Sequence, residues 1–276
     1  MAVRLVATDM DGTFLDGQGS FDRERFSRIL VQLEEKNIPF VIASGNGIAR
    51  LLQLFKGFEE RLIFVADNGA HVYHAGKTVI RRSIQQEETK AILEFFQGRW
   101  AEVCLMLSTE KNIYMQAGAG VPFAGTDLPI EPAQMAAFQS RVSYLDDLSV
   151  YPISEQIYKI GLWVPESRVD KVTEEFNQVF QGQLVAVTSG YGSVDILPQG
   201  IHKAWGLEQV LTCLDIEPNQ VMAFGDSDND IELLSYVGYS YAMENATDKV
   251  KAVAKYQAPS HLEAGVLQVL EEHVLQ

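Results

Sequence analysis

Three short runs of apolar residues each end abruptly in a polar loop, and this pattern already restricts the chain to a small set of folds. The loops that follow the runs are DMDG (9–12), SGNG (44–47) and GDSDND (225–230). Strands that are apolar throughout are typical of a parallel sheet that is covered on both faces. Ligands of such sheets bind just outside the carboxyl ends of the strands. If the three runs share one sheet, we expect their polar loops to meet at a single site.

The N-terminal part of the chain follows a strand–helix–strand order. An apolar strand at 3–8 is separated from a second one at 40–44 by a helical pattern over 21–37. A third strand begins near residue 61, and a hairpin that turns at 75–77 follows it. This order predicts the beginning of a parallel-sheet domain.

The pattern changes in the middle of the chain. From 84 to 195 we expect a second set of strands and helices, with a Gly/Pro-rich loop over 118–132. After this segment the order of apolar strand, acidic loop and helix returns. We therefore predict an α/β protein with a discontinuous parallel-sheet core, formed by residues 1–83 and 196–276. A smaller α/β domain is inserted over 84–195.

The composition limits the classes of partner. The 276 residues carry a net charge of −15, which argues against a nucleic-acid partner. The same negative field repels anionic substrates, so a phosphate site needs local positive charge from a metal, a lysine or a helix N-terminus. The sequence shows no signal peptide, no apolar run of the roughly 18 residues that span a membrane, and only two cysteines. We expect a cytoplasmic protein without a membrane partner, either a monomer or a weak homo-oligomer.

The acidic residues at the strand ends indicate a hard cation. Asp9, Asp11 and Asp226 offer the oxygen ligands that Mg²⁺ prefers, and Mg²⁺ commonly acts together with substrate phosphates. The spacing after Asp226 does not fit the Ca²⁺-binding loop of an EF-hand. Asp228 and Asp230 are also compatible with a merely solvated acidic turn.

The same residues suit phosphoryl transfer. A carboxylate such as Asp9 can attack phosphorus and form an aspartyl-phosphate, while Asp11 passes a proton to the leaving group and later takes one from water. Ser44 and Gly45 open a helix and can direct donors at a phosphate. Lys203 lies at the start of another helix, where it either neutralises the phosphoryl group or is an ordinary surface lysine.

These motifs resemble those of a known family. DMDGTF, IASGN, the lysine of GIHKAWGL and FGDSDNDIELL stand in the order of the four motifs of the haloacid dehalogenase-like hydrolases. The resemblance covers nearly the whole chain, and DNGA, SVDILPQGIHKA and YAMENA are similar to the Cof-type branch, especially its sugar phosphatases. It implies a Rossmann-like, doubly wound core with an α/β cap domain, the substrate-specificity domain, inserted between the second and third motifs.

The resemblance also implies a role for each site residue. Asp9 is the nucleophile and Asp11 the general acid and base. Mg²⁺ is held by Asp9, Asp226 and the backbone oxygen of Asp11, with Asp230 in support. The phosphate is bound by the backbone of Met10 and by Ser44, Gly45, Lys203 and Asn229.

Two positions depart from the pattern of the wider Cof-type branch. Asn46 stands where many members carry an arginine, and Glu244 stands where glycine is common. Both changes agree with the sugar-phosphatase subset, although their effect on specificity does not follow from the sequence.

The leading hypothesis is a Mg²⁺-dependent phosphatase for small sugar phosphates, with the cap closing over the sugar. A phosphatase for a phosphorylated cofactor, such as pyridoxal phosphate or flavin mononucleotide, is the alternative, and a stacked aromatic side chain from Tyr114, Tyr158 or Trp163 would favour it. A non-catalytic phosphate-binding module is a third hypothesis, and it has no need of both Asp9 and Asp11.

Overall fold

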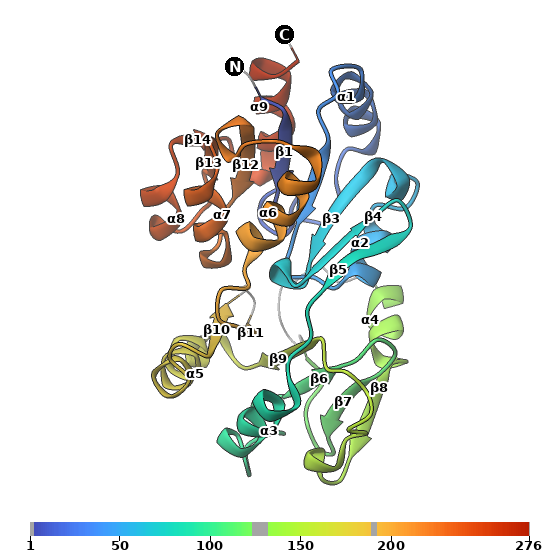
Figure 1. Cartoon of the computed structure of the whole chain (residues 1–276), viewed down its shortest axis with the longest axis vertical. Helices are drawn as coiled ribbons and strands as arrows, with labels where there is room; N and C mark the ends of the chain where they lie inside the picture. Colours follow the sequence, from blue (N-terminus) through green and yellow to red (C-terminus); the bar gives the residue numbers. More distant parts are fainter. Residues whose placement is uncertain (1–2, 123–131, 189–191, 276) are drawn as a thin grey trace. The chain divides into compact units, whose positions relative to one another are not determined.

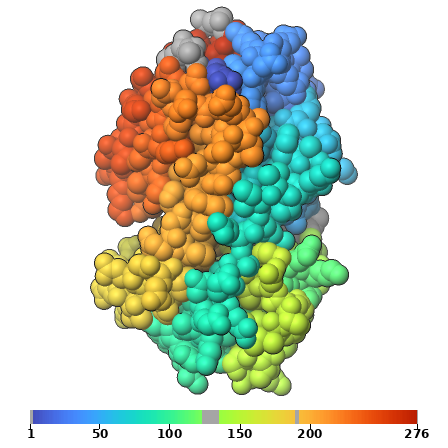
Figure 2. All heavy atoms as spheres, viewed as in Figure 1, coloured from blue at the N-terminus to red at the C-terminus, as the bar shows by residue number. Residues whose placement is uncertain are grey.

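The chain divides into two compact units. The computed structural model describes residues 3–122, 132–188 and 192–275. The first unit comprises residues 1–81 and 201–276, and the second comprises 82–200. The N-terminal and C-terminal segments of the first unit lie side by side on the face that Figure 2 shows, in blue to cyan and in orange to red.

The first unit is built on an eight-stranded sheet. Its strand order is β14-β13-β12-β1-β2-β3-β4-β5 (Figure 1). The pairs from β14 to β3 are parallel, and β4 and β5 are added as an antiparallel hairpin. The strands are β1 (Leu5–Thr8), β2 (Phe40–Ala43), β3 (Leu62–Ala66), β4 (His71–His74), β5 (Lys77–Arg81), β12 (Val221–Gly225), β13 (Tyr239–Met243) and β14 (Tyr256–Ala258).

Helices pack against this sheet and against one another. They are α1 (Arg23–Glu35), α2 (Ile48–Leu54), α6 (Lys203–Leu214), α7 (Ile231–Tyr236), α8 (Asp248–Val253) and α9 (Gly265–His273). The start of α1 is fixed by Asp22, whose side chain accepts a hydrogen bond from the backbone N–H of Arg25. The apolar stripe of α1 buries Phe26, Ile29 and Leu33, at the helical spacing that the sequence shows.

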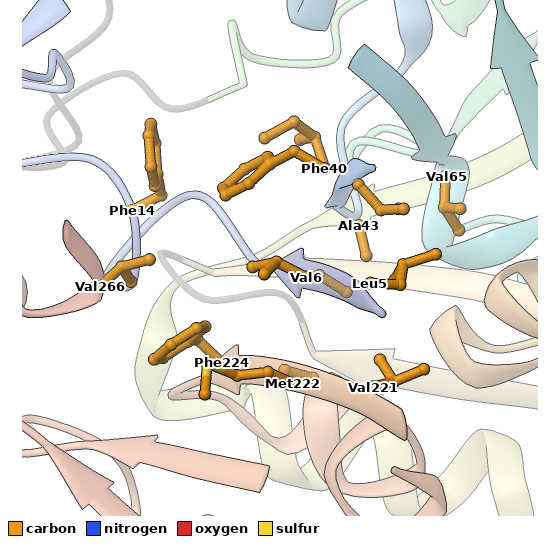
Figure 3. Packing of buried hydrophobic residues seen from close by; sticks show 14 of the residues in the cluster. Leu5, Val6, Phe14, Phe40, Ala43, Val65, Val221, Met222, Phe224 and Val266 are labelled. Carbon is orange, nitrogen blue, oxygen red and sulfur yellow. The ribbon is translucent and has the colours of Figure 1, made fainter. Parts of the chain in front are cut away.

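The core of the first unit surrounds β1. Figure 3 shows Leu5 and Val6 of β1 between side chains of β2 and β3 on one side and of β12 on the other. Every residue of β1, β2, β3 and β12 is buried. The central strands therefore have no solvent-facing side, which explains why their sequences are apolar throughout and do not alternate.

The second unit has its own sheet and its own core. Its strand order is β10-β11-β9-β6-β7-β8, antiparallel except for the pair β7 and β8. The strands are β6 (Met106–Ser108), β7 (Ile113–Gln116), β8 (Val142–Leu145), β9 (Lys159–Trp163), β10 (Leu184–Thr188) and β11 (Ser193–Pro198). The helices are α3 (Gln86–Phe95), α4 (Pro132–Gln139) and α5 (Glu166–Val179). Short 3₁₀ turns complete both units.

The predicted fold class is confirmed: a mainly parallel α/β sheet and a second, smaller α/β unit are both present. The strands β13 and β14 were not predicted. The second unit extends over 82–200, so β11 lies in it as a whole although the expected boundary runs through this strand. Much of the loop expected over 118–132 lies outside the described residues.

Within the described part of the chain, none of the helices combines the length and apolar character that crossing a bilayer requires.

Candidate active site

The three polar loops leave the same edge of the first sheet. Strand β1 lies between β2 and β12, and all three strands are parallel. Thr8, the last residue of β1, is aligned with Ile42 of β2 and with Phe224 of β12. The acidic loop after β1 therefore begins level with the loops after its two neighbours, which is the convergence that the sequence predicts.

A lysine and two carboxylates form the buried centre of this site. Lys203 Nζ lies 2.6 Å from Asp9 Oδ1 and 2.7 Å from Asp230 Oδ1. Lys203 is fully buried, and Asp9 and Asp230 are buried as well. Of the two roles that the sequence left open for Lys203, the surface lysine is therefore wrong. The buried lysine and the two buried carboxylates depend on one another, because removing the lysine or the carboxylates leaves a buried charge without compensation.

The carboxylates of Asp9, Asp226 and Asp230 form a cluster that fits a divalent metal ion. One oxygen from each residue lies within 4.8 Å of the others. Asp226 is held from two sides, because the hydroxyl of Thr13 donates to its Oδ1 at 2.6 Å and the hydroxyl of Ser227 donates to its Oδ2 at 3.0 Å. Three acidic oxygens in so small a volume match the ligand preference of Mg²⁺.

Gly12 allows the first and third loops to approach closely. A Cβ atom at this position would lie 2.5 Å from Asp226 Oδ2, and the backbone of Gly12 has a φ of +80°. Both the space and the backbone conformation therefore require glycine. The glycine of DMDG thus allows Asp226 to approach the loop that carries Asp9.

The pKa values of Asp9 and Asp226 are raised in this site. Burial raises the pKa of Asp9 well above its usual range, and the charges of Asp230 and Asp226 add to this although Lys203 opposes it. Burial and the charge of Asp230 raise the pKa of Asp226 to about 6. Burial alone would lower the pKa of Lys203, but Asp230 and Asp9 outweigh it and raise that pKa. The protein alone thus favours partial protonation of the acids, and a divalent cation would favour their ionised forms.

Asp11 is directed away from this cluster and toward the second loop. Asn46 Nδ2 donates to Asp11 Oδ2 at 2.6 Å, and Arg50 Nη2 donates to Asp11 Oδ1 at 3.1 Å. Arg50 also donates through Nη1 to Asn46 Oδ1 at 2.8 Å. Arg50 lies on α2, one turn beyond Asn46. Among the described residues, the side chain of Asp11 is therefore not part of the candidate metal cluster.

The other residues expected to bind phosphate lie in the loops that follow β1, β2 and β12. Met10 is fully buried, and its carbonyl accepts from the backbone N–H groups of residues 13–15. Ser44 follows β2, and its Oγ accepts from Asn46 N at 3.1 Å; Gly45 stands between these two residues. Asn229 is buried, and its Nδ2 donates to Asn68 Oδ1 at 2.9 Å.

Sequence reasoning missed Thr13, Arg50 and Asn68 as members of the site. Thr13 carries a recognisable signal, because it directly follows the glycine of the first acidic loop. The only sequence signal for Arg50 is its position in the helix expected to begin near Ile48, four residues after Asn46. Asn68 belongs to the DNGA motif, which the resemblance quoted without giving it a role.

Comparisons with known proteins agree with this geometry. Residues 6–270 match the family model of the haloacid dehalogenase-like hydrolases. A 5-amino-6-(5-phospho-D-ribitylamino)uracil phosphatase from Escherichia coli is 33% identical over 99% of this chain and 96% of its own. A phosphatase of the same description from Bacillus subtilis is 23% identical over 99% of this chain and 96% of its own.

A solved structure extends the likeness to three dimensions. A protein from Streptococcus mutans has 35% sequence identity and a TM-score of 0.87, with 99% of this chain and 100% of that chain covered. A specific similarity to sugar phosphatases is not shown, because the E. coli relative is named as a phosphatase of 5-amino-6-(5-phospho-D-ribitylamino)uracil. The chain belongs to the haloacid dehalogenase-like hydrolases, in their Cof-type branch, and is a phosphatase.

Proposed function

We propose that the protein is a Mg²⁺-dependent phosphomonoester hydrolase that uses Asp9 as its nucleophile. The observation that carries the proposal is the buried contact of Asp9 with Lys203, beside the two further carboxylates of Asp226 and Asp230. A buried carboxylate beside a fixed cation is oriented and protected from water, and both properties favour attack on phosphorus.

The reaction proceeds in two displacements at phosphorus. An oxygen of Asp9 bonds to phosphorus while the ester P–O bond breaks, and Asp11 gives a proton to the departing alkoxide. Asp11 then takes a proton from a water molecule, whose oxygen bonds to phosphorus as the bond to Asp9 breaks. Inorganic phosphate leaves and Asp9 is restored. Lys203 offsets negative charge on the phosphoryl group in both steps.

Mg²⁺ would be held by Asp9, Asp226 and the backbone oxygen of Asp11. When bound, it would supply positive charge that stabilises the phosphoryl oxygens. Asp230 has a different task in this scheme. It accepts hydrogen bonds from Lys203 Nζ and from the backbone N–H groups of Asp226 and Ser227, so it fixes the lysine and the third loop together.

For the substrate, we propose the phosphate ester of a polyol chain attached to a pyrimidine, as in 5-amino-6-(5-phospho-D-ribitylamino)uracil. The descriptions of the E. coli and B. subtilis relatives support this choice. We also propose that the second unit, 82–200, selects the rest of the substrate. Tyr114 is buried there and donates to Glu155 at 2.7 Å. Tyr158 and Trp163 are partly exposed and can stack on a pyrimidine ring.

The test is phosphate release from a panel of esters in the presence of Mg²⁺. The panel holds 5-amino-6-(5-phospho-D-ribitylamino)uracil, flavin mononucleotide, pyridoxal phosphate, a pentose phosphate and a hexose phosphate. We expect kcat/KM to be at least about tenfold higher for the first ester, a ratio of the size that a set of specific pocket contacts provides. A preference for a sugar phosphate would contradict the proposed substrate and leave the proposed reaction intact.

Asp9→Asn is the matched variant for the reaction. It keeps the shape of the side chain but removes the nucleophilic oxygen anion, so we expect it to fold and to release no phosphate. Unchanged release by this variant would exclude the covalent route. A wild-type protein that binds phosphate but hydrolyses none of the esters would favour the non-catalytic alternative.

A further inference from the structure

The turn after β3 has an unusual backbone. Asp67 and Asn68 have φ values of 49° and 52°, and Gly69 has a φ of 99°. A positive φ is costly for Asp67 and Asn68, although asparagine and aspartate tolerate it better than most residues, and glycine adopts it freely. All three residues are buried. A strained and buried turn persists only where its surroundings hold it in place.

The turn contacts the second loop and the third loop at the same time. The backbone N–H of Asn68 donates to Ser44 O at 3.0 Å, and the backbone N–H of Asp67 donates to Asn46 O at 3.0 Å. From the other direction, Asn229 Nδ2 donates to Asn68 Oδ1 at 2.9 Å. Asn68 thus contacts one residue of each of the two loops that are expected to bind phosphate.

The same turn also supports the start of α6. A Cβ atom on Gly69 would lie 2.1 Å from His202 O and 3.2 Å from Lys203 N. The backbone of Gly69 therefore packs directly on the first turn of the helix that carries Lys203. This contact explains why the third residue of the turn is glycine.

The hydrogen bond to Asn68 decides how the Asn229 amide is turned. Asn229 Oδ1 is buried and has no hydrogen-bond partner among the described residues, so the contact of Nδ2 with Asn68 is what fixes the plane of the amide. An amide nitrogen carries two hydrogens. One is used by Asn68, and the other is left with a fixed direction for a substrate oxygen.

We propose that Asn68 is a positioning residue of the phosphate site. Its backbone contacts Ser44 and its side chain orients Asn229, and it does so without touching the substrate itself. This inference rests on the proposed function, because Ser44 and Asn229 bind phosphate in that scheme. Loss of the Asn68 side chain then weakens phosphate binding in the ground state and the transition state alike, which raises KM and leaves kcat nearly unchanged.

Asn68→Gly is the most direct variant, because glycine adopts a positive φ without strain and deletes only the side chain. Asn37 provides a matched control: it is exposed, has a φ of 56° and lies in the same unit, at the end of α1. Asn68→Ser and Asn37→Ser form a second pair of variants. Both place a serine at a positive φ, so both carry the same backbone strain.

The measurements are the dissociation constant of inorganic phosphate by titration calorimetry in Mg²⁺, and KM and kcat for the best ester of the panel. We expect Asn68→Gly and Asn68→Ser to raise the dissociation constant and KM by about tenfold relative to the Asn37 variants, as for the loss of one hydrogen bond. In the double variant Asn68→Gly/Asn229→Ala, the binding of phosphate should be within twofold of Asn229→Ala alone, because Asn68 acts through Asn229.

Equal phosphate binding by the Asn68 and Asn37 variants would overturn the inference, and so would additive losses in the double variant. Failure of both Asn68 variants to fold would also overturn it, since Asn68 would then be a structural residue. If the wild type binds phosphate without hydrolysing any ester, the proposed function fails, but the calorimetric comparison still decides the role of Asn68.

Discussion

Arg50 and Asp11 form an ion pair in which Nη2 lies 3.1 Å from Oδ1. Asn46 donates to the second oxygen of Asp11 and accepts from Arg50, so the three side chains form a closed set of contacts. Arg50 thus brings a guanidinium into contact with Asn46, the position where many Cof-type members carry an arginine. The carboxylate of Asp11 is held in one direction, although its side chain is partly exposed.

We expect Arg50→Ala to lower kcat about tenfold and to leave KM within twofold. The reason is that Asp11 transfers the proton in the proposed reaction, and a freely rotating carboxylate spends less time in a reactive position. Arg25→Ala is the control, since Arg25 is as exposed as Arg50 and also pairs with a carboxylate, that of Glu271. Steady-state kinetics of both variants check the prediction, and an equal effect of the two would contradict it.

Lys203→Met should abolish activity and lower the free energy of unfolding by about 3–5 kcal/mol, as for the loss of one partner of a buried ion pair. The loss should be greater at pH 8 than at pH 5. Lys203 is the group that lowers the pKa of Asp9, so without it that pKa rises further. A carboxyl group whose pKa is raised in the folded state stabilises the fold at low pH. This stabilisation is lost as the pH rises through the pKa that the group has in the folded protein. Urea unfolding at the two pH values measures the difference.

Mg²⁺ should stabilise the protein, and the effect should increase as the pH rises through about 6. Asp226 has a pKa of about 6 in the metal-free protein, above its usual value near 3.8. Because the pKa of Asp226 is raised in the fold, its protonated form stabilises the metal-free fold at low pH, and this stabilisation is lost as the pH rises through about 6. Above pH 6 the ionised Asp226 can bind the cation. At a Mg²⁺ concentration of 100 times the dissociation constant, the gain is about 2.7 kcal/mol.

Thermal unfolding with Mg²⁺ and with EDTA at pH 5 and pH 7.5 tests this expectation. Asp226→Asn should remove most of the Mg²⁺ effect, whereas Asp228→Asn should keep it. Asp228 pairs with the exposed Lys249 and is not in the carboxylate cluster. A Mg²⁺ effect of the same size in Asp226→Asn would place the metal elsewhere.

His71 should make the fold sensitive to mild acid. Its burial, with the charge of Arg81, lowers its pKa to about 4. A histidine with a lowered pKa stabilises the fold above its unfolded value near 6.5, and this contribution is lost as the pH falls from 6.5 toward 4. By pH 5 the loss amounts to roughly 2 kcal/mol.

The measurement is the free energy of unfolding of wild type and His71→Gln at pH 7.5 and pH 5, in the presence of EDTA. The wild type should lose more stability than the variant over this interval, by the amount given above. His74→Gln is the control, because His74 lies in the same hairpin and is exposed. A wild type and a His71 variant with parallel pH profiles would refute the assignment.

Much of the site follows from the order of residues along the chain. The apolar runs before Asp9, Ser44 and Asp226 predict strands that are buried on both faces. Parallel strands end at one edge, so the polar loops behind them must meet there. The spacing of acids and glycines predicts a metal and a phosphate at that edge. These conclusions need only local periodicity and the rule that strands pair in parallel.

Other features do not follow from local order, because they depend on which side chains meet after packing. Nothing around Lys203 in the sequence shows that it becomes fully buried between Asp9 and Asp230, which lie 194 and 27 residues away. Strand β13 pairs with β12, and the edge strand β14 pairs with β13; this pairing makes both part of the sheet, although their sequences were not recognised as strands.

The sequence alone therefore determines the fold class, the acidic loops and the chemistry that they favour, since each of these depends on residue type and short spacing. Tertiary structure decides that Asp11 is held by Asn46 and Arg50, and that Asn68 joins Ser44 to Asn229. The physical reason is that such hydrogen bonds join residues that are distant in the chain, and their directions are set only when the sheet and its helices have packed.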